Sequence, residues 1–205
     1  MKFPFLASFI VFIFVFTLYN RRNEKIRKNR EKEYWEKERQ SNSVRRKSLD
    51  DLEYLSVPFL DFPMETAIED EIVSSCISEL DSLRDEKIVN LTGFTNTDLK
   101  LAYGTANITQ LSQYDQNYTL LVRTLQKWAS RLYELGYHDD ALTILEYAVL
   151  TRTDISATYY LAASIYQEKG QYDKIRHLLF VAETLQSAMK NTIVRTLKES
   201  YPDIG

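Results

Sequence analysis

The sequence predicts an all-α protein, and three observations carry that prediction. Apolar residues recur at three- and four-residue steps along most of the chain after Glu65. Alternating apolar and polar residues, which would indicate strands, are missing throughout. The third observation is an internal repeat of 34 residues, the separation of Gly136 and Gly170. We therefore expect a helical soluble domain of about 140 residues, enough to bury one hydrophobic core.

An uncharged apolar run within residues 1–19 predicts that this segment is a membrane anchor. The run extends from Phe3 to Tyr19, and as a helix its seventeen residues would span roughly 25 Å, near the short end for a hydrocarbon core of ~30 Å. A signal peptide would need small residues at a cleavage site, yet alanine and glycine are both absent from residues 8–66. The pattern favours an uncleaved single-pass transmembrane helix over its two alternatives, a cleaved signal peptide and a buried hydrophobic helix.

Residues 20–55 are predicted to form a charged juxtamembrane helix and linker, with the helix breaking near Ser41–Ser43. Residues 20–47 carry twelve Lys/Arg against five Glu, whereas residues 48–205 carry thirteen Lys/Arg against 24 Asp/Glu. Phosphate affinity comes from basic surface, so nucleic acid is not an expected partner of the acidic remainder.

Membrane topology follows from the same charges. Nine Lys/Arg lie between Arg21 and Arg39, and the positive-inside rule places the rest of the chain on the cytoplasmic side of the cell membrane. Residues 21–47 are suited to anionic lipid headgroups, although a solvated charged helix is the simpler alternative. Sequons for N-glycosylation occur at Asn90, Asn107 and Asn117. Motifs this short arise by chance and weigh little against nine positive charges. The single cysteine, Cys76, agrees with a reducing compartment.

Residues 56–117 are predicted to form the helical N-terminal part of the soluble domain. Two prolines mark residues 56–63 as a non-helical connector. A helix is then expected over Glu65–Lys87. Its buried stripe would comprise Ile68, Ile72, Cys76, Leu80 and Leu83. The thiol on this stripe is expected in the core rather than in catalysis. A short helix should follow, capped by Asn96 or Thr97 and ended by Gly104.

The repeat occupies residues 118–152 and 153–186, with a capping helix expected at 187–200. Seven of 27 aligned positions are identical between the two units. The conserved pairs include Ala129/Ala163, Gly136/Gly170, Asp139/Asp173 and Ala148/Ala182. Small alanines allow close helix approach, the glycines end a helix in a left-handed turn, and the aspartates are expected to cap the next helix.

This pattern resembles the tetratricopeptide repeat (TPR), a helix–turn–helix unit whose period is also 34 residues. The likeness rests on Trp128 and Tyr159 near the start of the first helix, Tyr166 within it, Tyr172 at the turn and Ala141 in the second helix. Departures are Leu132, His138 and Ile175 at the corresponding positions of the other unit, and Thr153–Asp154 where the family has a proline. Because about three repeats are usually needed, helices before Tyr118 should supply a further neighbour. The arrangement is also similar to small membrane-anchored TPR proteins of Gram-positive bacteria.

The resemblance implies a groove, lined by the first helix of each unit, that binds a protein or peptide partner. Its register assigns to that groove Arg123, Gln126, Lys127, Ser130, Tyr133, Tyr160, Ser164, Gln167, Asn191 and Arg195. The family's carboxylate clamp for chaperone tails keeps only Arg195, so that ligand class is not expected. Tyr133 and Tyr160 are the strongest candidates for contact, because rigid aromatics lose little entropy at an interface.

No catalytic or metal-binding motif occurs in the sequence, so neither an enzyme activity, a metal nor a cofactor is expected. His138 takes the turn-aromatic position and His177 is expected on the surface. The leading hypothesis is a membrane-tethered protein–protein interaction adaptor. Two alternatives are a self-associating structural membrane protein, which would form a homo-oligomer, and an extracytoplasmic binding module delivered by a cleaved signal.

Overall fold

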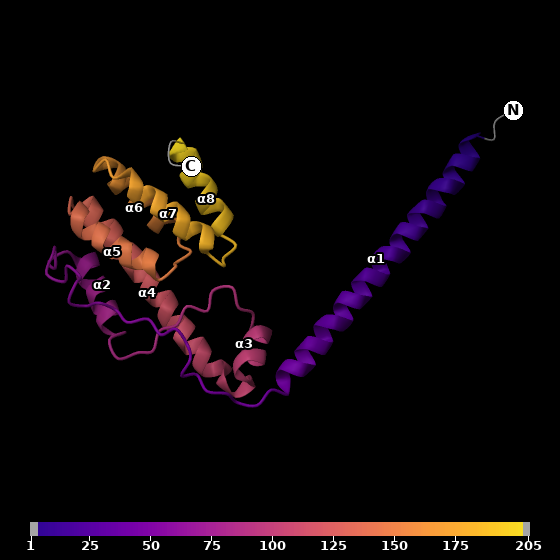
Figure 1. The fold of residues 1–205 in the computed structure, drawn as a ribbon, viewed down its shortest axis with the longest axis horizontal. Coiled ribbons are helices and arrows are strands. Elements are labelled where there is room, and N and C mark those ends of the chain that lie inside the picture. Colours follow the sequence, from indigo (N-terminus) through magenta and orange to yellow (C-terminus); the bar gives the residue numbers. More distant parts are fainter. Residues whose placement is uncertain (1–3, 203–205) are drawn as a thin grey trace. The chain divides into compact units, whose positions relative to one another are not determined.

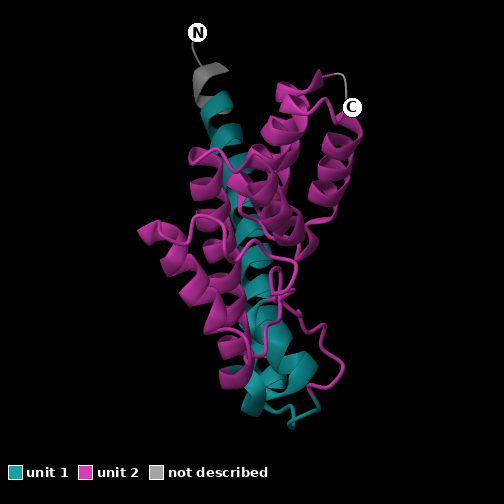
Figure 2. Cartoon of the chain, turned by 90° about the vertical axis from the view of Figure 1, so that its left-hand side faces the viewer, with its two compact units in different colours: residues 1–48, 95–108 teal, residues 49–94, 109–205 magenta. Residues whose placement is uncertain are grey.

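The computed structural model describes residues 4–202, with side chains from Ser8 onward, and within these residues it contains eight α-helices and no strand (Figure 1). The predicted all-α class is confirmed. The chain divides into two compact units (Figure 2): residues 1–48 with 95–108, and residues 49–94 with 109–205.

The first unit joins the end of a long helix to a short one. Its elements are α1 (Pro4–Asn42), α3 (Asn96–Tyr103) and the 3₁₀ turn η1 (Thr105–Asn107). The helix α1 ends where the sequence predicted a break. Ion pairs hold it to α3: Lys100 Nζ lies 2.6 Å from Glu38 Oε1, and Lys37 Nζ lies 2.8 Å from Asp98 Oδ1.

The N-cap of α3 lies one residue before the nearer of the two predicted caps, Asn96 and Thr97. Thr95 is the N-cap: its hydroxyl accepts the Asp98 N–H, and the Asp98 carboxylate accepts the Thr95 N–H at 3.1 Å. The hydrogen bond from Lys37, together with this reciprocal capping box, lowers the pKa of Asp98 to about 2. Gly104 ends the helix as predicted, with a φ of 86°.

The predicted anchor at residues 1–19 begins outside the described residues. From Phe9 to Tyr19 the large apolar side chains of α1 are exposed, and the charged part follows within the same helix. Among the residues that the structure describes, no helix has the length and apolar character needed to span a membrane. The structure thus gives no support to the predicted transmembrane helix.

The second unit is a stack of helices. It contains α2 (Glu71–Asp81), α4 (Ile108–Glu134), α5 (His138–Leu150), α6 (Ser156–Glu168), α7 (Tyr172–Thr184) and α8 (Lys190–Ser200). The first residue of α4, Ile108, belongs to the first unit. From α5 onward each helix packs against the next one in the chain (Figure 1). The last helix, α8, begins three residues after the start of the predicted capping helix and ends at the predicted residue.

Two glycine turns divide the stack into helical pairs. Gly136 joins α4 to α5 with a φ of 87°, and Gly170 joins α6 to α7 with a φ of 68°. These left-handed turns match the prediction from the repeat. The predicted caps are wrong: Asp139 and Asp173 lie inside the first turns of α5 and α7. There their charge favours the exposed N–H groups, but no side-chain cap bond forms.

The core runs through both pairs and into α2. Trp128 and Tyr159, matched by the repeat, are both fully buried. The matched alanines Ala129, Ala163, Ala148 and Ala182 are fully buried as well. The ring of Trp128 meets Phe62 edge-on, at 5.8 Å between centroids. This aromatic contact attaches the connector of residues 56–63 to the helices, as its apolar composition suggests.

The helix predicted over Glu65–Lys87 is shorter than expected. It is α2, which begins after Asp70 and ends at Asp81. Ile68 and Ile72, placed on the buried stripe by the sequence pattern, are exposed. The remaining three members of the stripe, including Cys76, are buried, and burial raises the pKa of the Cys76 thiol. The thiol is thus a core group, as predicted.

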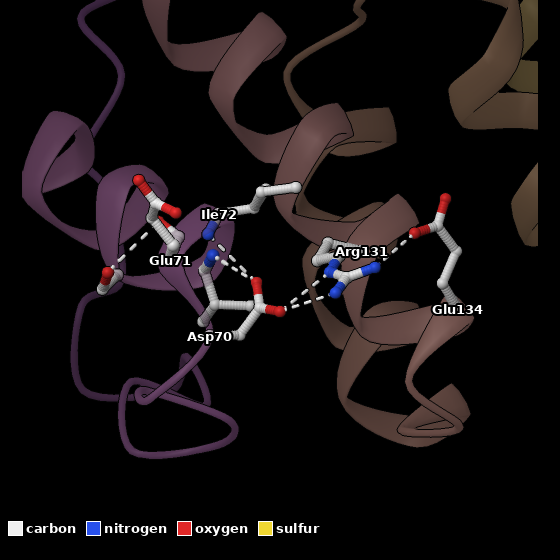
Figure 3. A network of polar contacts seen from close by, with 7 residues as sticks. Asp70, Glu71, Ile72, Arg131 and Glu134 are labelled. Carbon is white, nitrogen blue, oxygen red and sulfur yellow. Dashed lines mark hydrogen bonds and ion pairs between the residues drawn. The ribbon is translucent and has the colours of Figure 1, made fainter.

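Asp70 fixes both the start of α2 and its attachment to α4 (Figure 3). One carboxylate oxygen of Asp70 accepts the N–H groups of Ile72 and Val73, at 3.0 and 3.1 Å. The other oxygen accepts Nε and Nη2 of Arg131, at 3.0 and 2.7 Å, and Arg131 also pairs with Glu134. The Arg131 guanidinium lowers the pKa of Asp70. These bonds, together with the hydrogen bond from the Thr124 hydroxyl to Glu79 at 2.9 Å, connect α2 to α4.

Candidate functional site

A hollow of about 790 Å³ lies along the exposed side of α4, and we call it the α4 groove. Three segments contribute its walls: the α4 helix, the loop of residues 91–94, and Asp154–Ile155. From α4 come Asp115, Tyr118, Thr119, Val122, Arg123, Gln126 and Lys127. A second hollow of about 610 Å³ shares Thr119, Arg123 and Lys127 with it and reaches Glu79 of α2 and Leu120.

The loop of residues 91–94 is held in place by Asn90. The Asn90 amide donates to the Tyr118 hydroxyl at 2.9 Å and to the Thr151 carbonyl at 3.0 Å, while its oxygen accepts the Thr92 N–H. Gly93 has a φ of 94°, and a Cβ there would lie 2.9 Å from Gln186 Cβ. Only glycine fits this turn without a shift. The tightened loop leaves the Phe94 ring exposed at the edge of the groove.

The opposite wall follows the end of α5. Arg152 adopts a φ of 59°, which turns the chain out of the helix, and the Tyr159 hydroxyl donates to the Thr153 carbonyl at 2.9 Å. Asp154 then accepts a hydrogen bond from Ser187 at 2.5 Å. Thr153–Asp154 thus closes the first repeat with hydrogen bonds in the position where the TPR family has proline.

The charged side chains of the groove differ in whether they have hydrogen-bond or ion-pair partners. The Arg123 side chain is exposed and makes no hydrogen bond or ion pair with any described residue, and Lys127 Nζ lies 3.8 Å from Glu79 Oε1. Asp115 is half-buried, and burial raises its pKa although a backbone hydrogen bond from Leu91 partly opposes the shift. The groove therefore holds two half-buried carboxylates, Asp115 and Asp154, and an arginine free to pair with a ligand.

Replacing Asp115 with asparagine is expected to stabilise the protein at neutral pH. A carboxyl group whose pKa is raised by folding stabilises the fold most when protonated, and this contribution is lost as the pH rises through its folded pKa. Asparagine keeps an acceptor for Leu91 and cannot ionise. We expect the Tm of Asp115→Asn to exceed the wild-type value by about 1–3 °C at pH 7 and to converge with it at acidic pH. Equal Tm values across this range, measured by circular dichroism, would contradict the prediction.

The ten residues predicted for the groove fall into two groups. Arg123, Gln126 and Lys127 line the α4 groove. The others do not line it: Ser130, Tyr133, Tyr160, Ser164, Gln167, Asn191 and Arg195. Gln126 accepts a hydrogen bond from Thr158 at 2.7 Å and donates to Ser130 at 2.9 Å, which ties α4 to α6.

Tyr133 is engaged in a contact within the stack. Its hydroxyl donates to Glu168 at 2.8 Å, and its ring stacks on His138 with 4.4 Å between centroids. His138 Nδ1 also lies 3.1 Å from Glu168. These contacts join the two glycine turns and give His138 the structural role that the turn-aromatic position predicted. His177 is exposed on α7, as expected.

Sequence reasoning missed Phe94, Asp115, Asp154 and Ile155. The adjacent Gly93 was the one available signal for Phe94, since a glycine turn followed by an aromatic residue indicates a presented side chain. Within the described part of the chain, no cluster of three or more potential metal ligands occurs.

The three sequon asparagines are used inside the fold. Asn90 holds the groove loop, and the Asn117 amide donates to the Lys87 carbonyl at 3.0 Å. The Asn107 amide, fully buried in the first unit, donates to the carbonyls of Lys47 and Tyr103, each at 2.8 Å. Glycosylation of these amides would break the hydrogen bonds, so the sequons carry structural rather than glycan-bearing asparagines in the folded state.

Comparison of the chain with models of known families, with curated proteins and with solved structures gave no match.

Proposed function

We propose that this protein is a membrane-tethered adaptor that binds a protein or peptide partner along the α4 groove. The observation that carries the proposal is the combination of an exposed Phe94 ring, the free Arg123 and the half-buried Asp115 around one hollow. Aromatic residues, including phenylalanine, and arginine are enriched at protein interfaces. None of the groove residues forms a nucleophile–base pair, so the arrangement is suited to binding rather than to catalysis.

The TPR assignment belongs to the same proposal. Paired helices joined by Gly136 and Gly170, with Trp128 and Tyr159 buried at matching positions, support it. Stacked helical pairs of this kind present extended binding surfaces. The α4 groove differs from the surface implied by the family register, because one wall comes from the loop of residues 91–94.

Tethering is proposed from the first unit alone. The exposed apolar side chains of α1 between Phe9 and Tyr19 would be stabilised by lipid, and the basic residues from Arg21 onward would favour anionic headgroups on the cytosolic side. A tether raises the local concentration of a membrane-bound partner, so that even a groove of low affinity is occupied.

Site-specific photocrosslinking in the native membrane tests the adaptor function. A photoreactive amino acid at Thr119, exposed on α4 in the groove, is compared with one at Thr143, exposed on α5 outside it. We expect a discrete heterologous product from position 119, lost in the Phe94→Ala/Arg123→Ala double variant, and none from position 143. Identical products from both positions would contradict the groove. A product made of two copies of this chain would favour self-association instead.

A further inference from the structure

The α4 groove adjoins two more hollows that lead away from α4. A hollow of about 320 Å³ shares Thr92 and Phe94 with the groove and is bordered by the end of α5 and residues 184–187. The last hollow of the series, of about 420 Å³ between α5 and α7, shares Leu150, Arg152 and Thr184 with the hollow of about 320 Å³. The three hollows therefore form a series, joined at Phe94 and at Leu150–Arg152.

Large apolar side chains are exposed along this series. Phe94 is 54% exposed, Leu150 75% and Phe180 63%. Phe94 borders both the α4 groove and the hollow of about 320 Å³. Leu150 borders both that hollow and the hollow of about 420 Å³, and Phe180 lines the latter. Single exposed apolar residues are ordinary on protein surfaces. Three that border adjoining hollows form an apolar surface on which a ligand can pack, with a pocket beside each side chain.

The charge of the series is balanced, unlike that of the acidic domain: four carboxylates and four Lys/Arg border its hollows. Residues 48–205 carry an excess of acidic groups. Along the series, however, Arg123 and Arg152 make no side-chain hydrogen bond or ion pair with any described residue.

Two of the four nearby carboxylates are engaged by neighbouring side chains. Asp154 accepts from Ser187 at 2.5 Å, and Glu146 accepts from Tyr166 at 2.5 Å and lies 3.6 Å from Lys174. Glu53, on the rim of the hollow of about 320 Å³, and Asp115 in the α4 groove have no cationic partner among the described residues and would oppose a negative ligand beside them. Arg123 and Arg152 are therefore the positions at which the series favours carboxylates of a ligand.

We propose that the partner segment is an extended, acidic peptide with spaced apolar residues, which runs from the α4 groove past Phe94 and Leu150 to Phe180. This rests on the proposed function and specifies the chemistry of its partner. Carboxylates of the peptide would pair with Arg123 and Arg152, for which the guanidinium fork is suited. Different helices border each hollow, so a peptide that follows all three must bend, which a straight helix does not do. An extended segment also advances about 3.3 Å per residue, roughly twice the rise of a helix, so fewer residues reach all three hollows.

Selection from a random-peptide phage library on the full-length chain in detergent micelles tests this chemistry. Inserts of about fifteen residues reach roughly 50 Å when extended. Enriched peptides are expected to contain more Asp/Glu than Lys/Arg, with spaced Phe, Leu or Ile. They should survive counter-selection on the Arg123→Gln/Arg152→Asn variant, because they no longer bind it; asparagine tolerates the positive φ of residue 152. Enrichment of neutral or basic peptides, or of none, would overturn the proposal.

The path is tested with the best synthetic peptide and single variants of exposed residues. Fluorescence anisotropy should show Kd raised about tenfold by Arg123→Gln and by each of Phe94→Ala, Leu150→Ala and Phe180→Ala. The matched controls Arg176→Gln and Leu135→Ala alter exposed residues that border none of the three hollows and should leave Kd unchanged.

The two proposals fail in different ways. If Phe94→Ala and Arg123→Gln weaken binding but Leu150→Ala and Phe180→Ala do not, the extended path is wrong and the α4 groove stands. If no variant weakens binding and position 119 gives no crosslink, the adaptor function falls as well. Loss of binding in all four variants, with both controls unchanged, supports the full path.

Discussion

Trp128→Ala is expected to lower the free energy of unfolding by about 3–5 kcal/mol, the range for removing a large aromatic side chain from a packed core. Trp128 is fully buried, and its ring meets the edge of Phe62, which holds the connector of residues 56–63 against the helices. The substitution would leave a cavity where α4 meets this connector. Urea denaturation followed by far-ultraviolet circular dichroism measures the loss, and the Tm should fall by roughly 10 °C.

Trp128→Phe provides the control for this prediction. The indole Nε1–H of Trp128 is buried and has no hydrogen-bond partner among the described residues. Phenylalanine fills most of the volume and removes this unsatisfied donor, which offsets part of the lost packing. We therefore expect Trp128→Phe to cost less than half as much as Trp128→Ala. Equal losses for the two variants would show that cavity formation is not the dominant effect.

The repeat allowed the helical pairs to be predicted because its determinants are local. A glycine in a left-handed turn and a small residue at a helix contact act through neighbours that recur at the same sequence distance. Gly136 and Gly170 accordingly end helices, and Trp128 and Tyr159 occupy the core.

The boundary of α2 shows where local pattern fails. Ile68 and Ile72 continue an apolar periodicity, so the sequence predicted a longer helix. The start is fixed instead by Asp70, which is bonded both to the first turn and to Arg131, 61 residues away. Neither the cap nor its partner is apolar, so a search for hydrophobic periodicity passes over both.

The candidate site was predictable on the helix but not in the loops. Arg123, Gln126 and Lys127 follow from the face of α4 that the repeat register exposes. The position of Phe94 depends on Asn90, whose amide contacts Tyr118 and Thr151 at separations of 28 and 61 residues. The sequon pattern drew attention to Asn90 for glycosylation, whereas its importance lies in these hydrogen bonds.

Gly104→Ala is expected to disrupt the first unit far more than Gly136→Ala disrupts the second. Both glycines have similar positive φ values, 86° and 87°, so each substitution costs about 1–3 kcal/mol in backbone strain, and the ψ of 149° at Gly104 lies near a region that essentially only glycine adopts. The surroundings differ: a Cβ at Gly104 would lie 2.3 Å from the Arg45 carbonyl oxygen, whereas a Cβ at Gly136 would meet no atom within 4 Å. Backbone must therefore move at Gly104, which adds roughly 1–3 kcal/mol.

Limited trypsin digestion of the full-length chain reads out this difference, since Arg45, Arg46 and Lys47 lie at the predicted clash. The Lys47 N–H donates to the Tyr103 carbonyl at 3.0 Å and Arg46 Nε donates to Asn107 at 2.9 Å, so displacement of this segment frees cleavage sites that are now held. We expect rapid cleavage after residues 45–47 in Gly104→Ala, and wild-type digestion there in Gly136→Ala. Wild-type cleavage in both variants would mean that the segment accommodates the methyl group, and the tight approach of Arg45 to Gly104 would not be what holds it to α3.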